Sequence, residues 1–237
     1  MKSLTHEFYM RRACELAEQG YSAPNPLVGC VIVRDGKIVG EGFHLMAGTS
    51  HAEIVALQQA GSKARGSTVY LTLEPCAHHG RTPPCADALI AAGVERVFVY
   101  QSDRTAAGGG NAKLREAGIK VEVDSFRVAS PNMIWSKLAW QGIPFVTIKA
   151  AVTLDGRMGP GIITNESSRR KGRQLRAQHG AVLVGAETAL QDDPQLTVRD
   201  VILNEPPVRI ILDPRRRLPD TLRVFTDGLA PTWRVVS

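Results

Sequence analysis

Residues 68–93, TVYLTLEPCAHHGRTPPCADALIAAG, predict a strand, a turn and a helix in immediate succession. The first six of these residues are rich in β-branched and aromatic side chains, which is typical of a buried strand. A helix is expected from about residue 84 to residue 92, just before Gly93. Cys76 and Cys85 therefore fall between a strand and the first turn of a helix, where backbone N–H groups and the helix dipole stabilise a thiolate.

Upstream, the sequence His51-Ala52-Glu53 supplies an imidazole and a carboxylate. One imidazole and two thiolates are an accepted ligand set for catalytic zinc, which keeps a further position open for water. We therefore expect His51, Cys76 and Cys85 to bind zinc. Glu53 can reach the same pocket without binding the metal, and we expect it to be the catalytic proton carrier, as in the zinc deaminases of bases and nucleotides.

Each of these residues also has an ordinary structural interpretation. A single buried cysteine usually packs as a small hydrophobic residue, and a single histidine is usually a hydrogen-bonded polar residue. The combination of H-A-E, P-C and P-P-C in this order favours the metal site over those interpretations. Cys14 and Cys30 lie in apolar or amphipathic runs and are expected in the core.

The composition of the 237-residue chain limits the classes of function. No run of about 18 apolar residues occurs, so no membrane span is expected, and the N-terminus lacks the apolar core of a signal peptide. We expect a cytoplasmic protein, because thiolate ligands suit a reducing compartment. The net charge of +6 comes from scattered basic residues, and aromatic residues make up only 5%. This pattern does not predict nucleic-acid binding, whereas a small phosphorylated substrate explains it.

Strands and helices alternate after an initial hairpin, which predicts a three-layer α/β/α domain. The two-residue turn Asp35-Gly36 between apolar runs favours a hairpin with a primed turn. Functional residues are expected at the carboxyl ends of the strands. The predicted helices cover residues 4–19, 51–60, 84–92 and 111–117, and the predicted strands cover residues 28–34, 37–43, 68–73, 96–100 and 119–123.

A second domain is expected after a linker that ends near Pro144, so the predicted domains are residues 1–143 and 144–237. Its predicted elements are again those of an α/β domain with parallel strands. The strands are expected at residues 144–151, 181–185 and 208–212, a helix at residues 167–178, and the opening of one more strand at residues 232–237. The run of three arginines at residues 215–217 is expected to form a solvated turn after a strand.

The motifs of the first domain resemble the bifunctional deaminase/reductase family of bacterial riboflavin biosynthesis (RibD). The matching stretches are N-P-L-V-G-C-V-I-V at residues 25–33, G-E-G-F-H at residues 40–44, H-A-E, and residues 73–85. Eight residues separate the two cysteines, as in that family, whereas many cytidine and tRNA deaminases have only two. The resemblance implies a cytidine-deaminase-like fold and the deamination of a diaminohydroxyphosphoribosylaminopyrimidine, in which zinc-activated water replaces an amine and ammonia is released.

The resemblance also implies substrate contacts. Asn25 and His44 would hold the pyrimidine or the ribose, and Arg81 would meet the phosphate, for which a guanidinium is a good partner. The family usually carries D-P-N-P at a loop where residues 103–106 read D-R-T-A. A deaminase of a related heterocycle pathway therefore remains an alternative. The glycines at residues 108–110 are expected to form a turn rather than a nucleotide-binding loop.

The second domain resembles the reductase half of the same family, which uses NADPH. Residues 149–157, KAAVTLDGR, match its opening strand, and residues 192–199, DDPQLTVR, match a later segment. By resemblance, Val152, Thr188 and Asp192 would face the cofactor. Arg176, Leu196 and Arg199 would face the phosphoribosyl substrate.

Two departures from the family reduce the expected reductase activity. The loop between Arg157 and Ile163 is shorter than in the family, and the sequence ends before the glycine-rich segment that would bind the pyrophosphate. We therefore expect a partial reductase-like domain with little NADPH binding. Two alternatives stay open: a partner chain completes the domain and restores both activities, or residues 144–237 serve as a dimerisation module. A homo-oligomer is expected in either case, because exposed sheet edges tend to pair.

Overall fold

A five-stranded sheet organises the first of two units in the computed structural model, which describes residues 2–79, 83–123, 126, 129–159, 161–199, 203 and 205–237. The units span Met1–Phe145 and Val146–Ser237. In chain order, the first unit contains α1 (Lys2–Ala17), β1 (Gly29–Arg34), β2 (Lys37–Phe43), α2 (Ala52–Ala60), a 3₁₀ turn (Gly61–Ala64), β3 (Thr68–Leu71), α3 (Cys85–Ala92), β4 (Arg96–Val99), α4 (Gly110–Glu116), β5 (Lys120–Val123) and α5 (Met133–Gln141).

The strands of this sheet lie in the order β2-β1-β3-β4-β5. β1 is antiparallel to both of its neighbours, and β3, β4 and β5 are parallel to one another. Asp35 and Gly36 join β1 to β2 with φ values of 51° and 73°. Both angles are positive, as a primed two-residue turn requires, and the predicted hairpin is confirmed.

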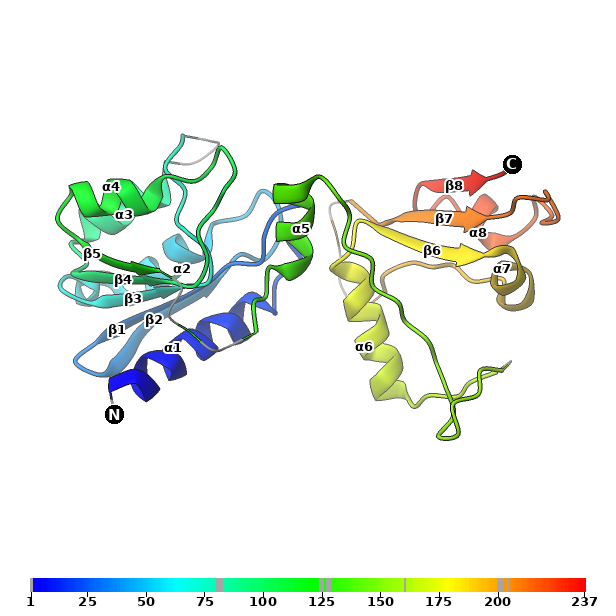
Figure 1. Cartoon of the computed structure of the whole chain (residues 1–237), viewed down its shortest axis with the longest axis horizontal. Coiled ribbons are helices and arrows are strands. Elements are labelled where there is room, and N and C mark those ends of the chain that lie inside the picture. The colour runs from blue at the N-terminus through cyan, green and yellow to red at the C-terminus, as the bar shows by residue number, and fades with distance from the viewer. Residues whose placement is uncertain are drawn as a thin grey trace. The chain divides into compact units, whose positions relative to one another are not determined.

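Helices cover both faces of the sheet, so the predicted three-layer α/β/α architecture is confirmed (Figure 1). α1 packs on one face, against Val31 and Val33 of β1. Cys30 and Ile32, the residues that alternate with them, point to the other face, where α2, α3 and α4 pack. This period-two pattern is what a strand covered on both sides needs. Cys30 and Cys14 are buried, as expected.

Two glycines of β2 allow α2 to lie directly on the hairpin. A Cβ at Gly40 would overlap the carbonyl oxygen of Ala56, and a Cβ at Gly42 would overlap that of Ala52. The helix backbone therefore approaches closer than any side chain would permit. Because His51 immediately precedes α2, this contact also positions the backbone of His51.

The second unit contains a three-stranded parallel sheet in the order β6-β7-β8. Its inward side packs on a small core that includes Ala189, Ile211 and Val224. None of the helices in the described part of the chain has the length and apolar character needed to cross a membrane. The elements are α6 (Glu166–Ala177), β6 (Ala181–Gly185), α7 (Ala186–Asp192), β7 (Val208–Leu212), α8 (Arg223–Thr226) and β8 (Thr232–Val235).

The strand predicted at residues 144–151 is wrong, because this stretch is coil in the structure. Its alternating apolar residues fit a strand, but a strand also needs a neighbour whose backbone groups complete its hydrogen bonds. No strand pairs with it among the described residues. Val146 and Ile148 are consequently 74% and 90% exposed. α5, α7 and α8 were not predicted.

The fold yields a prediction about Gly42. Gly42→Ala places a methyl group against the Ala52 carbonyl, so α2 must move away from β2. We expect the free energy of unfolding of the first unit to fall by about 1–3 kcal/mol, measured by urea titration. Gly36→Asn is the control, because asparagine tolerates a left-handed backbone and Gly36 has open space around it. Equal stability of the two variants would contradict the close contact.

Candidate active site

Three potential metal ligands from separate elements meet at the carboxyl end of the sheet. His51 precedes α2, Cys76 follows β3, and Cys85 begins α3. The Nδ1 atom of His51 lies 3.1 Å from Sγ of Cys85 and 3.7 Å from Sγ of Cys76. The three ligand atoms all lie within 4.8 Å of one another. The structure thus brings together the residues that the sequence predicts as zinc ligands.

The first turn of α3 stabilises negative charge on Cys76. The backbone N–H of Cys85 donates to Sγ of Cys76 at 3.3 Å. Hydrogen bonds from the Cys85 thiol, from His51 and from this N–H lower the pKa of Cys76 to about 4, against the opposing effect of burial. A thiolate ligand is therefore available at neutral pH.

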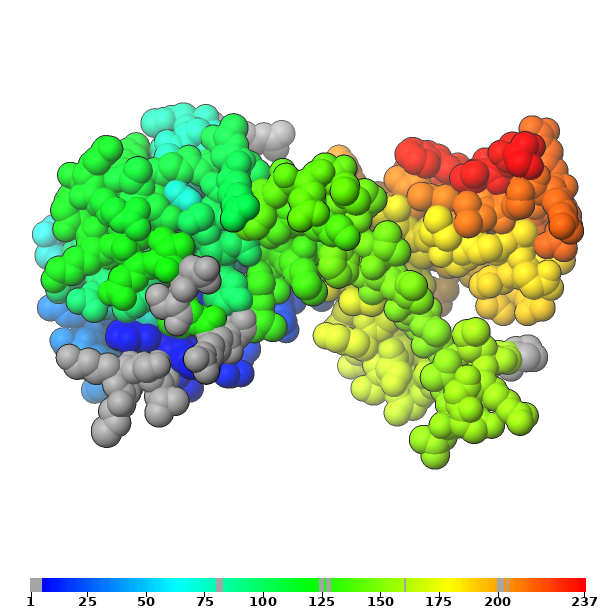
Figure 2. Space-filling model, in the orientation of Figure 1, coloured from blue at the N-terminus to red at the C-terminus, as the bar shows by residue number. Residues whose placement is uncertain are grey.

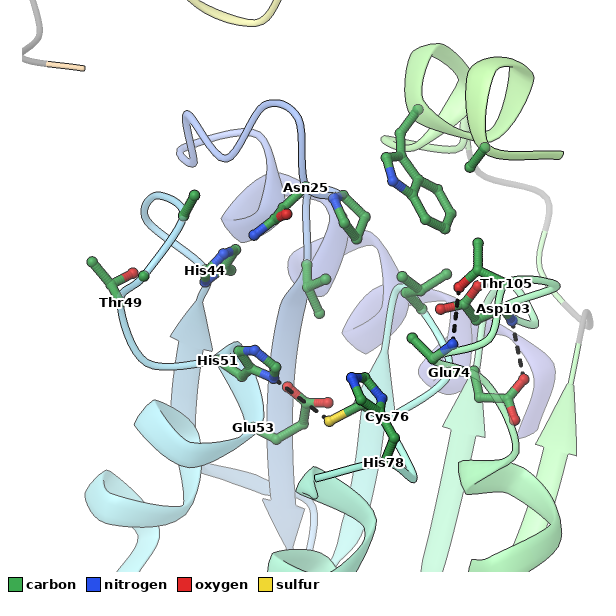
Figure 3. A pocket seen from close by; sticks show the side chains of 18 residues that line it. Asn25, His44, Thr49, His51, Glu53, Glu74, Cys76, His78, Asp103 and Thr105 are labelled. Atoms are coloured by element: carbon green, nitrogen blue, oxygen red, sulfur yellow. Dashed lines mark hydrogen bonds between the residues drawn. The ribbon is translucent and has the colours of Figure 1, made fainter. Parts of the chain in front are cut away.

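Glu53 lies in the first turn of α2, beside His51 and Cys76 (Figure 3). Its side chain is buried, and Oε2 has no hydrogen-bond partner among the described residues. Burial raises the pKa of Glu53 to about 7. A buried carboxyl group whose second oxygen is unpaired can accept and return a proton.

His51, Glu53 and Cys76 line a pocket of about 620 Å³. Asn25 and His44 line it too, where the resemblance predicted substrate contacts (Figure 3). Nδ1 of His44 lies 3.2 Å from the Ser50 carbonyl, to which it can donate, while Nε2 is buried and without a partner in the described structure. Burial lowers the pKa of His44, so the ring is neutral and Nε2 can accept a hydrogen bond. Arg81, the predicted phosphate contact, lies outside the described residues.

One wall of the pocket comes from a loop that Glu74 holds. Asp103 and Thr105 of this loop line the pocket, and Glu74 lies beneath them, directly before the Pro75–Cys76 turn (Figure 3). The carboxylate of Glu74 accepts hydrogen bonds from backbone N–H groups of the loop. Glu74 is not among the site residues predicted from the sequence. Its place in L-E-P-C, as a charge next to a buried strand, was the available signal.

A further wall comes from α5, which the sequence analysis missed. Trp135 and Ala139 of this helix line the pocket. Just before α5, the buried side chain of Asn132 accepts from the Leu27 N–H at 2.8 Å and donates to the Leu27 carbonyl at 2.9 Å. This amide ties the start of α5 to the segment that carries Asn25. No sequence pattern local to α5 reveals such a long-range contact.

In the second unit, the structure brings together the residues predicted to hold a phosphoribosyl group. Arg176 of α6 donates to the carbonyl of Thr197, next to Leu196. Burial lowers the pKa of Arg176, and the nearby charges of Arg199 and Arg173 lower it further. Clustered guanidinium groups favour an anion nearby. Leu196 itself is buried in the core of the unit.

The residues predicted to face NADPH are only partly grouped. Thr188 and Asp192 are exposed on α7, one helical turn apart. Val152 is 48% exposed and lies in the coil after residue 144 rather than in the expected strand.

Comparisons with known proteins assign both parts of the sequence. Residues 3–101 match the cytidine and deoxycytidylate deaminase zinc-binding region, and residues 144–237 match the RibD C-terminal domain. The chain is 44% identical to the riboflavin biosynthesis protein RibD of Bacillus amyloliquefaciens, with alignment over 96% of this chain and 64% of that protein. It is 45% identical to RibD of Escherichia coli, over 96% of this chain and 68% of that protein.

A solved structure from Thermotoga maritima has the same fold over the whole chain. It is described as a diaminohydroxyphosphoribosylaminopyrimidine deaminase/5-amino-6-(5-phosphoribosylamino)uracil reductase. The TM-score is 0.84 at 37% identity, over 100% of this chain and 71% of that one. The chain thus spans about two thirds of the length of these relatives.

Proposed function

The chain belongs to the RibD family of riboflavin biosynthesis proteins, and on that premise we propose that it is a zinc-dependent deaminase of a diaminohydroxyphosphoribosylaminopyrimidine. The carrying observation is the convergence of the ligand atoms of His51, Cys76 and Cys85. They meet at a pocket lined by Glu53, whose Oε2 has no hydrogen-bond partner among the described residues. The name of the Thermotoga maritima relative supports the choice of substrate. A related heterocycle stays the alternative.

The donor set fits zinc. Zinc binds thiolate sulfur at about 2.3 Å and imidazole nitrogen at about 2.0–2.1 Å, so one ion can reach donors 3.1–3.7 Å apart. Three protein ligands leave one position for water, as in catalytic rather than structural sites. When bound, zinc supplies a nucleophile at neutral pH by lowering the pKa of a water molecule.

Glu53 performs the proton transfers in this proposal. It takes a proton from the attacking water as a C–O bond forms at the ring carbon that bears the exocyclic amine. It then delivers one proton to the neighbouring ring nitrogen and another to the amine, so that the C–N bond breaks and ammonia leaves. Burial suits Glu53 to this exchange, because it raises the pKa of the carboxyl group to about 7 and Oε2 accepts no hydrogen bond from the described residues.

The part of the pocket lined by His44 and Asn25 orients the substrate. His44 presents an unprotonated Nε2, which can accept a hydrogen bond from an N–H or O–H group of the pyrimidine or ribose. Asn25 offers both a donor and an acceptor to the same ligand. Arg81 remains a predicted phosphate contact.

The second unit resembles a reductase, and we propose that it reduces substrate poorly. Arg176 and Arg199 still form a basic site that suits a phosphoribosyl group. The cofactor side is less developed, since Val152 lies in coil and only five residues separate Arg157 from Ile163. The second unit would therefore make few contacts with NADPH.

The homo-oligomer also stays a proposal, and an apolar sheet face supports it. The side chains of Leu183, Leu212 and Trp233 point away from the core of the second unit and are 56%, 38% and 60% exposed. β8 lies at the surface of this unit (Figure 2). Parallel sheets are normally covered on both faces. Because thiolate ligands suit a reducing compartment, we also propose that the reaction takes place in the cytoplasm, with a small molecule rather than nucleic acid as substrate.

The first prediction concerns the metal. A Cys76→Ser, Cys85→Ser double variant should lose the single zinc ion that we expect per chain, because a hydroxyl is a poor substitute for a thiolate. Elemental analysis of purified protein measures this. Cys14→Ala is the control, since Cys14 is buried in α1 away from the cluster. Stoichiometric zinc in the double variant would remove the ligand assignment.

The second prediction concerns Glu53. Glu53→Gln keeps the shape of the side chain but cannot carry a proton. We expect bound zinc and fold to persist while ammonia release from the pyrimidine substrate falls about 10²–10⁴-fold. Deamination at a near wild-type rate would show that another group carries the proton.

The third prediction concerns NADPH. Calorimetric titration of a preparation that contains zinc and deaminates should give no saturable NADPH binding at micromolar concentration. The coil at Val152 and the short stretch between Arg157 and Ile163 offer NADPH few contacts. Each 1.4 kcal/mol of contact free energy that is lost weakens binding about tenfold. Micromolar binding together with substrate-dependent NADPH oxidation would show instead that the second unit is a working reductase.

A further inference from the structure

Glu74 is a buried acidic residue whose carboxylate binds three backbone N–H groups in residues 103–111, which comprise the loop after β4 and the first two residues of α4. Oε2 accepts from Asp103 at 3.0 Å, and Oε1 accepts from Gly109 at 2.9 Å and from Asn111 at 3.0 Å. The side chain is only 9% exposed. Bonds from N–H groups to an ionised carboxylate are among the stronger hydrogen bonds in proteins. One side chain therefore holds both ends of the loop at residues 103–111.

The loop is also packed tightly against the turn that carries Cys76. A Cβ at Gly110 would overlap the carbonyl oxygen of Pro75, and a Cβ at Gly108 would overlap that of Asp103. Gly109 has φ of 100°, which disfavours other residues. Gly110 thus allows a close approach to the Pro75–Cys76 turn, Gly108 allows a close approach within the loop, and Gly109 supplies a positive φ. The run that the sequence predicts as a simple turn therefore has specific backbone roles.

Backbone hydrogen bonds also join the loop to the segment around the Pro75–Cys76 turn. The N–H of Glu74 donates to the carbonyl of Gln101 at 2.9 Å, and that of Ala77 donates to the carbonyl of Ala107 at 3.3 Å. These two bonds fix the loop where it leaves β4 and where it passes Cys76. The Glu74 carboxylate adds hydrogen bonds to the N–H groups of Asp103 and Gly109.

The part of the loop that Glu74 positions faces the pocket. Asp103, Thr105 and Ala107 line the cavity that also contains His51 and Cys76 (Figure 3). Within the loop, Asp103 accepts from the Thr105 N–H at 2.8 Å, so its backbone and side chain are ordered together. A shift of the Asp103 N–H would therefore move Thr105 as well.

We propose that Glu74 is a positioning residue for substrate affinity: it holds the loop at residues 103–111 in the shape that meets the substrate, and it does not act on the metal. The part of this inference that concerns affinity rests on the proposed deaminase function. A solely structural carboxylate would change stability alone. A positioning residue changes KM more than kcat, because the loop contacts bind substrate and transition state alike.

Glu74→Gln tests the proposal, because the amide preserves volume and one acceptor oxygen. With that oxygen at the Oε1 position, the bonds from Gly109 and Asn111 persist, while the NH₂ group meets the Asp103 N–H as a second donor. Amide hydrogen exchange followed by NMR should show the Asp103 N–H losing protection about tenfold or more. KM for the pyrimidine substrate should rise about tenfold, with kcat changed less than about threefold and zinc content unchanged.

Glu74→Ala removes all three bonds and should expose the three amides together, with a larger rise in KM. Glu116→Gln is the matched control, since Glu116 is an exposed glutamate at the end of α4, outside the pocket. It should leave the protection of all three amides and KM unchanged.

Three results would overturn the proposal. The first is unchanged exchange at Asp103, Gly109 and Asn111 in both Glu74 variants. The second is faster exchange with an unchanged KM, and the third is a loss of zinc and kcat at constant KM. If the wild-type chain does not deaminate, the proposed function fails on its own, while amide exchange still decides whether Glu74 holds the loop.

Discussion

The close packing of α2 on the β1–β2 hairpin is the constraint on which the site depends. Two cysteines at the β3–α3 junction are useful to a metal only if an imidazole reaches them from another element. Gly40 and Gly42 let the α2 backbone lie against β2, and His51 immediately before α2 then points at both sulfurs. Glu53 follows within the first turn of the same helix. One backbone contact thus places both the imidazole and the proton carrier.

The remaining walls of the pocket are placed by buried polar side chains that bind backbone. Glu74 fixes the loop after β4, and Asn132 ties the start of α5 to Leu27. Both side chains form hydrogen bonds with backbone groups that are distant in the sequence. These bonds satisfy polar groups that are shielded from water, as is usual for buried polar groups. Glu53, the proposed proton carrier, differs from these two side chains, because its Oε2 has no hydrogen-bond partner among the described residues. The pocket walls are held in place by hydrogen bonds, while Glu53 stays available for proton transfer. Such a site can bind a substrate and also exchange protons with it.

Local sequence patterns predict most of the first unit and its metal cluster. Strand periodicity gives the alternation of Cys30 and Ile32 with Val31 and Val33, and the H-A-E and P-C motifs identify the ligand atoms that the structure brings together. α5 escapes such reasoning, because it begins at a buried Asn132 whose partner is 105 residues away. The stretch at residues 144–151 shows the opposite failure: its apolar alternation fits a strand, yet in the described structure no neighbouring strand completes its hydrogen bonds.

The central claim is that one imidazole and two thiolates bind a catalytic zinc ion in this pocket. X-ray absorption at the zinc edge of the purified chain tests it most directly, because sulfur and nitrogen scatter differently. We expect two sulfur neighbours at about 2.3 Å and nitrogen or oxygen neighbours at about 2.0–2.1 Å, one of them an exchangeable water. A spectrum without sulfur in the first coordination sphere, or with four sulfurs and no water, would contradict the site described for His51, Cys76 and Cys85.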